Sequence, residues 1–323
     1  MNMIVRWILP PILTLGTIFP AAAQTWPDRP IKFISSQAAG NGTDVVGRLV
    51  ADRLSGRVGQ PIIFENRPGG GNVIGTQAAA RSPADGYTFF FASAAALVTD
   101  PYTFKSLPYD PMKDFTVISR IAEVTFTVLA HPDVPAKSLR ELFAYAKANP
   151  DKLAIATDGA RRFSGMIAAW LNKLGGTTMS YVPYTSINQG TQDVLAGRVQ
   201  LLILAYPAAK GHIAAGKLRA LAVTSPQRLP ELPDVPAVAE IFPGFDFAGW
   251  WVLATPTGVP ADIVARVNKE MGVVMKDPDV VGRLESAGFR TRGGGTLKEV
   301  NDFVQRQHAA WGTLVKEIGL TPE

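Results

Sequence analysis

One loop near the beginning of this chain carries the residue types and the spacing that bind an anion. Residues 35–44 read Ser-Ser-Gln-Ala-Ala-Gly-Asn-Gly-Thr-Asp, and they follow an apolar run from Ile31 that is typical of a buried strand. A helix is predicted from about Thr43, because apolar residues recur at helical spacing between positions 46 and 54, and Thr43 or Asp44 is the expected N-cap. The first N–H groups of a helix lack intrahelical partners and lie at the positive end of its dipole. The loop is therefore predicted to hold a carboxylate or a phosphate.

Two interpretations of this loop compete. Gly40-Asn-Gly42 resembles the start of the dinucleotide-binding pattern G-x-G-x-x-G, and Glu65 follows about twenty residues later at the end of the next predicted strand. Val45 occupies the position of the third small residue, so the match is partial. The other interpretation is a solute-binding cleft that holds an anion and does no chemistry.

The N-terminal segment favours the second interpretation. Residues 1–23 are predicted to be a cleaved secretory signal, with Arg6 as the positive region, an apolar stretch at 7–19 and alanines at 21–23. An uncleaved anchor is the alternative, but the apolar stretch is interrupted by prolines and too short to span a bilayer. We expect an exported protein without stable membrane insertion, in a compartment where NAD is not normally available.

Composition excludes several classes of protein. The chain has no cysteine, which rules out disulfides, thiolate metal sites, a cysteine nucleophile and a lipid anchor at a cysteine. The formal charge is +5, and the basic residues are scattered without a run or a nucleic-acid motif, so no nucleic-acid partner is expected. Mild positive charge suits an anionic solute, or it serves solubility alone.

No catalytic constellation is visible. The three histidines, His131, His212 and His308, are isolated from one another and from any motif, and neither G-x-S-x-G nor H-E-x-x-H occurs. Ser164 precedes a helical pattern without an evident base in its segment. We therefore expect no catalytic residue, no metal site, no cofactor and no enzymatic activity.

The arrangement of predicted elements indicates two α/β lobes. Strands that are near-continuous apolar runs alternate with amphipathic helices, which predicts mostly parallel sheets flanked by helices. Two long extended runs, at 115–130 and 245–254, are predicted to cross between the lobes. The first lobe is then 24–124 with 250–323, and the second is 125–249. A ligand is expected between them, where the carboxyl ends of the strands face each other.

Several motifs spread over the whole mature chain resemble the Bug-type solute-binding proteins of tripartite tricarboxylate transporters. That resemblance implies a two-lobe type II periplasmic binding protein fold, a monomer in the periplasm, a carboxylate solute, and delivery to the permease subunits of the transporter. The motifs are Trp26-Pro-Asp-Arg-Pro30, Ala38-Ala-Gly40 with Gly42-Thr-Asp44, Glu65-Asn-Arg-Pro-Gly69, Asp85-Gly-Tyr-Thr88, Leu107-Pro-Tyr-Asp-Pro111 with Lys113-Asp-Phe115, Val182-Pro-Tyr184, residues 215–225 and Leu232-Pro-Asp-Val-Pro236.

The resemblance also implies where the solute binds, and this chain departs from the family's pattern there. In the family the loop after the first strand holds one ligand carboxylate, and a second-lobe loop, here residues 157–164, supplies further donors. This chain has Ser-Ser-Gln at 35–37, Arg-Arg-Phe-Ser-Gly at 161–165 and Thr-Ser-Ile-Asn at 185–188, none of which is the usual family sequence. The differences are therefore expected to determine which solute is bound.

The arginines of the second loop predict a dicarboxylate. A guanidinium forms charge-assisted, often bidentate hydrogen bonds to a carboxylate, and it would lie opposite the helix N-terminus of the first lobe. Phe163, with Phe91, Tyr184 and Tyr206 near strand ends, could stack on a flat ring. An aromatic dicarboxylate such as terephthalate is the favoured solute; an aliphatic di- or tricarboxylate and a sensory role are the alternatives. If this loop does not bind the solute, its two arginines are solvated charges and Phe163 belongs to the core.

The predicted capture mechanism begins with a carboxylate on the first loop and ends with closure of the second loop over the far end of the solute. The predicted ligand-binding residues are Ser36, Gln37, Ala38, Ala39, Asn41, Gly42, Thr43, Ser93, Asp158, Arg161, Arg162, Phe163, Ser164, Tyr184, Thr185 and Tyr206.

Overall fold

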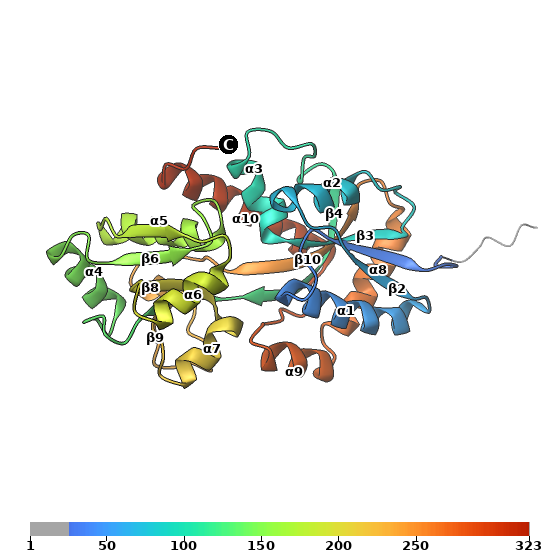
Figure 1. The fold of residues 1–323 in the computed structure, drawn as a ribbon. Coiled ribbons are helices and arrows are strands. Elements are labelled where there is room, and N and C mark those ends of the chain that lie inside the picture. Colours follow the sequence, from blue (N-terminus) through green and yellow to red (C-terminus); the bar gives the residue numbers. More distant parts are fainter. Residues whose placement is uncertain (1–25, 323) are drawn as a thin grey trace, which may run out of the picture.

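The computed structural model describes residues 26–322, so the predicted signal at 1–23 lies outside the described residues. Two five-stranded sheets, each flanked by helices, make up this part of the chain (Figure 1). The first sheet has the order β2 (Ile62–Asn66), β1 (Ile31–Ser35), β3 (Thr88–Ser93), β10 (Gly249–Pro256), β4 (Phe115–Val124). The second has the order β7 (Ser180–Pro183), β6 (Ala154–Thr157), β8 (Leu201–Ala205), β5 (Phe126–Ala130), β9 (Arg219–Val223).

Both sheets are mostly parallel, as predicted. In the first sheet β1 pairs in parallel with β2 and β3, and β10 is antiparallel to both β3 and β4. Four of its five described strands therefore run in one direction, and β10 runs against them. The second sheet repeats the arrangement, because β6 is parallel to β7 and β8 while β5 is antiparallel to β8 and β9. The reversed strand of each sheet is the one that has just crossed from the other lobe.

The two crossovers lie side by side and share one hydrogen-bonding residue. One residue, Thr125, separates the end of β4 from the start of β5. The fully buried Thr224 hydroxyl accepts a hydrogen bond from the Phe126 N–H at 3.0 Å and donates one to the Phe247 carbonyl at 2.9 Å. Because Phe126 and Phe247 lie on different crossovers, Thr224 links the two segments about which the lobes would rotate.

The helices cover the faces of the sheets much as the periodicity predicts. The stretch from 95 to 103 was not predicted to be helical, but it forms a π-helical turn followed by α3, directly after β3. The helices are α1 (Gly42–Val58), α2 (Val73–Ala80), α3 (Asp100–Thr103), α4 (Leu139–Ala148), α5 (Phe163–Gly175), α6 (Ile187–Leu195), α7 (Tyr206–Ala214), α8 (Ala261–Val274), α9 (Pro278–Ser286) and α10 (Leu297–Glu317), with short helical turns at Gly70–Asn72, Ala95–Thr99 and Val238–Glu240. Within residues 26–322, the structure contains no helix with the length and apolar character needed to cross a bilayer.

The last helix, α10, contacts both lobes. Its apolar face packs against β4 of the first sheet. Near its end the Trp311 ring lies 5.1 Å from the Phe163 ring of α5, and Lys173 of α5 donates a hydrogen bond to the Glu317 carbonyl. The C-terminal segment therefore lies against the same helix that begins at the arginine-containing loop.

Candidate functional site

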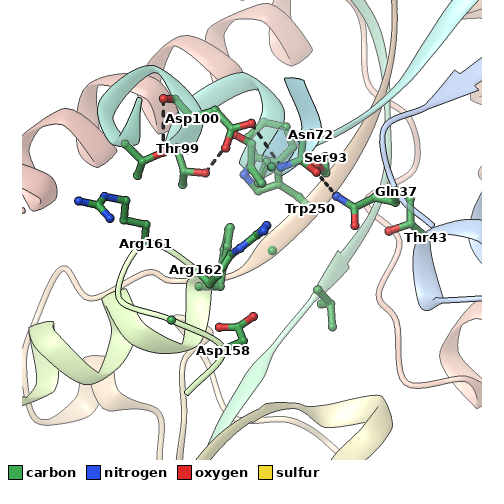
Figure 2. Close-up of a pocket in the computed structure, with 18 of the residues that line it drawn as sticks. Gln37, Thr43, Asn72, Ser93, Thr99, Asp100, Asp158, Arg161, Arg162 and Trp250 are labelled. Atoms are coloured by element: carbon green, nitrogen blue, oxygen red, sulfur yellow. Dashed lines mark hydrogen bonds between the residues drawn. The ribbon is translucent and has the colours of Figure 1, made fainter. Parts of the chain in front are cut away.

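A cavity of about 610 Å³ lies between the two lobes, at the carboxyl ends of the strands. Its walls come from the loops that follow β1, β2, β3 and β6 and from the two crossovers (Figure 2). The first lobe and the crossovers contribute Gln37, Thr43, Gly70, Gly71, Asn72, Ser93, Ala94, Ala95, Thr99, Asp100, Thr103, Phe104, Val124, Phe126, Gly249, Trp250 and Trp251. The second lobe contributes Asp158, Gly159, Ala160, Arg161, Arg162 and Phe163. Both loops predicted to bind the solute thus meet in one cavity.

Aromatic rings supply much of the apolar wall. The Trp251 indole N–H donates to the Thr43 hydroxyl at 2.9 Å, and the Trp250 indole N–H donates to the Gln307 amide oxygen at 3.3 Å. Since protein acceptors occupy both N–H groups, the two tryptophans offer ring surface to the cavity. Phe163 stacks on Phe126, with ring centroids 5.5 Å apart and planes 17° apart, so it lines the cavity and also belongs to the aromatic core.

Of the two neighbouring arginines, Arg162 presents its charge to the cavity. Figure 2 shows the Arg162 side chain directed between the lobes and the Arg161 side chain directed away from it. Arg161 donates to the Thr321 carbonyl at 3.1 Å, in the C-terminal segment. Within residues 26–322 the exposed Arg162 guanidinium takes part in no hydrogen bond or ion pair. It is close enough to Asp100 and Asp158 for its charge to oppose the rise that burial causes in the pKa of each. Arg162 is therefore the cation available to a ligand.

Asp158 directly follows β6 and is held by Ser164 of α5. Ser164 donates its hydroxyl to the Asp158 carboxylate and accepts a hydrogen bond from the Asp158 N–H at 2.9 Å. Burial raises the pKa of Asp158, and the hydrogen bonds from Ser164 and the charge of Arg162 oppose that rise. The Asp158 carboxylate, predicted to bind the solute, therefore already accepts a hydrogen bond from within this protein. Ser164 is committed to this contact and does not line the cavity.

The N-terminus of α1, in the first lobe, is also occupied by side chains of this protein. Its N-cap is Asn41, whose side chain accepts from the Asp44 N–H at 3.0 Å, so the prediction of Thr43 or Asp44 as the cap was wrong. The Asp44 carboxylate accepts from the Gly40 N–H at 3.0 Å and pairs with Arg48. Burial raises the pKa of Asp44, but these hydrogen bonds outweigh it and the pKa is lowered. A carboxylate of this chain thus takes part of the anion site predicted there.

A third carboxylate, Asp100, lies on the first-lobe side of the cavity. It is the first residue of α3 and is only 5% exposed. Gln37 donates to the Asn72 side-chain oxygen, and the Asn72 amide donates to the Asp100 carboxylate at 3.3 Å, so three residues from three segments form one chain (Figure 2). Burial raises the pKa of Asp100 to about 7 against the opposing effects of Asn72 and Arg162.

The structure places several predicted residues away from the cavity. Ala38, Ala39 and Gly42 are exposed on the rim with the half-buried Asn41, and Ser36 is buried with its hydroxyl unpartnered among the described residues. None of these five residues lines the cavity. The loop turns outward after Gln37, so its backbone approaches the cavity again only at Thr43.

The predicted aromatic stack was wrong for three of its four rings. Phe91 is buried in the core with its ring 5.4 Å from Phe64. The Tyr184 hydroxyl donates to Asp193 at 2.8 Å, and Tyr206 packs in a small apolar cluster of the second lobe. Neither tyrosine lines the cavity, nor does the exposed Thr185. The rings at the cavity are instead Trp250, Trp251, Phe104, Phe126 and Phe163.

Because Trp250 lines the cavity and Tyr184 does not, substitutions of these two aromatic residues should affect binding differently. Trp250→Leu should weaken binding of an aromatic carboxylate about tenfold, because ring contacts contribute roughly 1 kcal/mol beyond burial and Leu also removes contact area. Tyr184→Leu, the matched control in the second lobe, should change the dissociation constant by less than about twofold. Calorimetric titration of both variants checks this; a loss at Tyr184 equal to that at Trp250 would contradict the cavity described above.

Sequence reasoning missed the residues that the fold brings in from a distance. Asn72, Asp100, Trp250 and Phe104 come from three segments outside both predicted loops, because Asp100 and Phe104 lie at the two ends of α3. The sequence contains one signal for Asn72, which follows three consecutive glycines. In the structure Asn72 has a left-handed φ of 82°. A polar residue after a glycine run at the end of a strand indicates a special turn at the sheet edge where ligands bind.

Two α/β lobes with paired crossovers, and between them a cavity lined by aromatic and polar side chains, define a solute-binding receptor of the periplasmic type. Residues 46–320 match the family described as "Tripartite tricarboxylate transporter family receptor", and the chain belongs to that family. The protein BugT of Bordetella pertussis is 32% identical over 310 residues, covering 95% of this chain and 95% of BugT.

Solved structures agree with this assignment. The R. palustris protein Rpa4515, described with adipate, has a TM-score of 0.80 and 30% identity over 92% of this chain and 100% of that chain. MatC from Rhodopseudomonas palustris, described with bound malate, has a TM-score of 0.76 and 28% identity over 90% of this chain and 100% of that chain. Because the family and these relatives are binding proteins, the chain is a receptor and not an enzyme, and the dinucleotide interpretation of Gly40-Asn-Gly42 is wrong.

Proposed function

We propose that this receptor captures an aromatic dicarboxylate, with terephthalate as the representative solute, and delivers it to the permease of a tripartite tricarboxylate transporter. The observation that carries this proposal is the position of Arg162, an exposed guanidinium without a hydrogen-bond partner in residues 26–322, inside a cavity walled by aromatic rings. The guanidinium offers two parallel N–H donors to one carboxylate. The rings of Trp250, Phe104 and Phe126 offer a flat apolar surface to the body of the solute.

The binding residues of the proposed site are those that reach the cavity. Arg162 receives one carboxylate from the second-lobe side, and Gln37, Thr43 and Ser93 supply neutral donors on the first-lobe side. The protein works as a monomer in the periplasm, exported by the signal at 1–23, with the first lobe at 24–124 and 250–323 and the second at 125–249. Closure about the two crossovers excludes water from the solute, and the permease binds the closed form.

A second candidate solute is an aliphatic dicarboxylate. Rpa4515 is described with adipate and MatC with malate, and both structures resemble this one over nine-tenths of the chain. A flexible chain of methylenes could also occupy a cavity of about 610 Å³. A sensory receptor that presents the closed form to a kinase instead of a permease would use the same site.

Thermal unfolding against a panel of carboxylates tests the proposal. A ligand that binds only the native state raises the melting temperature by mass action, by an amount equivalent to about 2.7 kcal/mol at a hundredfold excess over the dissociation constant. We expect terephthalate to give a larger shift than benzoate, adipate, malate or citrate. A larger shift with adipate or malate would move the assignment to aliphatic dicarboxylates, and no shift with any carboxylate would overturn the proposal.

A further inference from the structure

A buried acid stands where a second anion would bind, and the proposed function does not account for it. Asp100 lines the cavity, is 5% exposed, and belongs to the lobe opposite Arg162. In the described residues 26–322 its carboxylate has one hydrogen bond, the 3.3 Å contact from Asn72, which is at the long end of the usual range. An ionised carboxylate this buried normally needs several donors or a close cation.

The charges around Asp100 do not provide that compensation. Arg162 is the cation that faces it across the cavity, and Arg162 also faces Asp158, which directly follows β6. Burial raises the pKa of the Tyr109 phenol, in the loop after α3, and the nearby Asp100 charge adds to that rise. The centroid of the His308 ring, on α10, lies 5.0 Å from the centroid of the Tyr102 ring of α3, and His308 does not line the cavity. With both acids ionised, one guanidinium would face two carboxylates before any ligand arrived.

A dicarboxylate in this cavity would add two more negative charges. One of them can be matched by Arg162, but the other would lie beside Asp100 in a site of low dielectric, where like charges strongly disfavour each other. The conflict disappears if Asp100 carries a proton. A neutral carboxyl group has an O–H donor, and the Asn72 amide already occupies one of the two Asp100 oxygens, which leaves the other for the ligand.

We propose that Asp100 contacts the ligand as a protonated acid, donating its O–H to the second carboxylate, and that ligand binding takes up one proton at this residue. This inference rests on the proposed dicarboxylate function and deepens it. The raised pKa of about 7 agrees with it, because the proton is then easily acquired near neutral pH. The buried, neutral acid also selects against ligands whose second polar group is a hydrogen-bond donor only.

The direction of the pH dependence follows from linkage. A ligand that binds the protonated form of Asp100 shifts its pKa upward, so protons bind with the ligand and affinity falls as pH rises through the pKa of the free protein. With that pKa at about 7, the dissociation constant for terephthalate or adipate should increase about 30-fold between pH 6 and pH 8.5. The carboxyl groups of the ligand titrate below this interval, so their contribution is small.

Titration calorimetry of the mature protein with terephthalate and with adipate, in buffers of different ionisation enthalpy, measures both quantities. At pH 8 we expect about one proton to be taken up per ligand bound. Asp100→Asn keeps a neutral donor of the same shape, so it should bind at pH 8.5 about as tightly as the unmodified protein at pH 6, with proton uptake abolished. His308→Asn, the control for the neighbouring titratable group, should keep the full pH dependence.

Three results would overturn the proposal. Affinity that rises with pH, together with loss of binding in Asp100→Asn, would mean that Asp100 is ionised and holds a cationic group of the solute. Tight binding that does not change with pH and is unaffected by Asp100→Asn would remove the donor role and leave the proposed function intact. Absence of binding by both dicarboxylates at pH 6 would overturn the proposed function, and the proton-donor role with it.

Discussion

Replacing Arg162 by alanine is expected to weaken binding of the carboxylate solute by about 100-fold or more. A hydrogen bond from a charged donor contributes roughly 1.5–3 kcal/mol, and two parallel bonds from one guanidinium to one carboxylate correspond to at least about 3 kcal/mol. Every 1.4 kcal/mol is about tenfold in the dissociation constant. The loss should exceed this simple count, because Asp158 would remain beside the incoming carboxylate without the opposing charge of Arg162.

Three further variants make this result specific. Arg162→Lys keeps the charge but loses the fork, so it should cost about tenfold. Arg161→Ala should cost clearly less than Arg162→Ala, since the Arg161 guanidinium contacts the Thr321 carbonyl outside the cavity. Arg140→Ala, on the exposed side of α4, removes the same charge without touching the cavity. Calorimetric dissociation constants at one ionic strength decide the matter, and equal losses at Arg161 and Arg162 would refute the assignment of Arg162 as the anchoring cation.

The contrast between Arg161 and Arg162 also marks the limit of what sequence could predict. Sequence placed both residues in the correct loop, at the end of the correct strand, because strand and helix periodicity are local properties. It could not say which arginine faces the solute, since that depends on a C-terminal segment some 160 residues away in the chain. Adjacent residues in a loop point in different directions, and a long-range contact selects one of them.

A similar argument applies to the two helix N-termini that face the cavity. The expectation of an anion site at the start of α1 was physically sound, but Asp44 supplies the anion from within the chain. Asp158, in the loop between β6 and α5, places a second carboxylate of the protein beside the beginning of α5, where it accepts from the Ser164 hydroxyl. An acidic residue in the first helical turn, such as Asp44 in α1, offsets the positive end of the helix dipole and so weakens the attraction of that end for a ligand anion. Both acids are visible in the sequence, but which N–H and O–H groups they accept from depends on the folded loop.

The alternation of strands and helices could be predicted from the sequence, but which strands pair with one another could not. Near-continuous apolar strands separated by helices indicated two parallel sheets, and the two extended runs indicated the crossovers. That β5 and β10 each insert between strands of the lobe they enter, antiparallel to both neighbours, depends on pairing between distant segments. This insertion places Trp250 and Trp251 at the cavity, which explains why sequence missed them.

Replacing Gly165 by alanine is expected to destabilise the fold and disable the site together. A Cβ atom at this position would lie 2.2 Å from the Gly159 carbonyl oxygen and 2.8 Å from the Ala160 Cα, both of which are backbone atoms that no side-chain rotation can move aside. Such overpacking costs typically 1–3 kcal/mol, and a contact this short against backbone belongs near the upper end, about 3 kcal/mol. Unfolding in denaturant measures that loss directly.

The effect on binding follows from what the Gly159 carbonyl holds. It accepts a hydrogen bond from the Arg162 N–H at 3.0 Å, which closes the loop and places the Arg162 side chain in the cavity. The added methyl group must displace this carbonyl, and Arg162 is displaced with it. Because a shift of about 1 Å in an anchoring group is enough to break a hydrogen bond, we expect at least about a tenfold loss of affinity in molecules that remain folded.

The matched control is Gly211→Ala in α7 of the same lobe, where an added Cβ meets no atom within 4 Å. In the interior of a helix this change removes backbone entropy from the unfolded chain, so it should stabilise the protein by about 0.5–1 kcal/mol and leave affinity unchanged. If Gly165→Ala lowers the free energy of unfolding and Gly211→Ala raises it, the close approach of backbone atoms at Gly165 is the cause of the destabilisation. Gly165→Ala with normal affinity would mean that the arginine loop is not held by its contact with α5, and the position of Arg162 would then need another explanation.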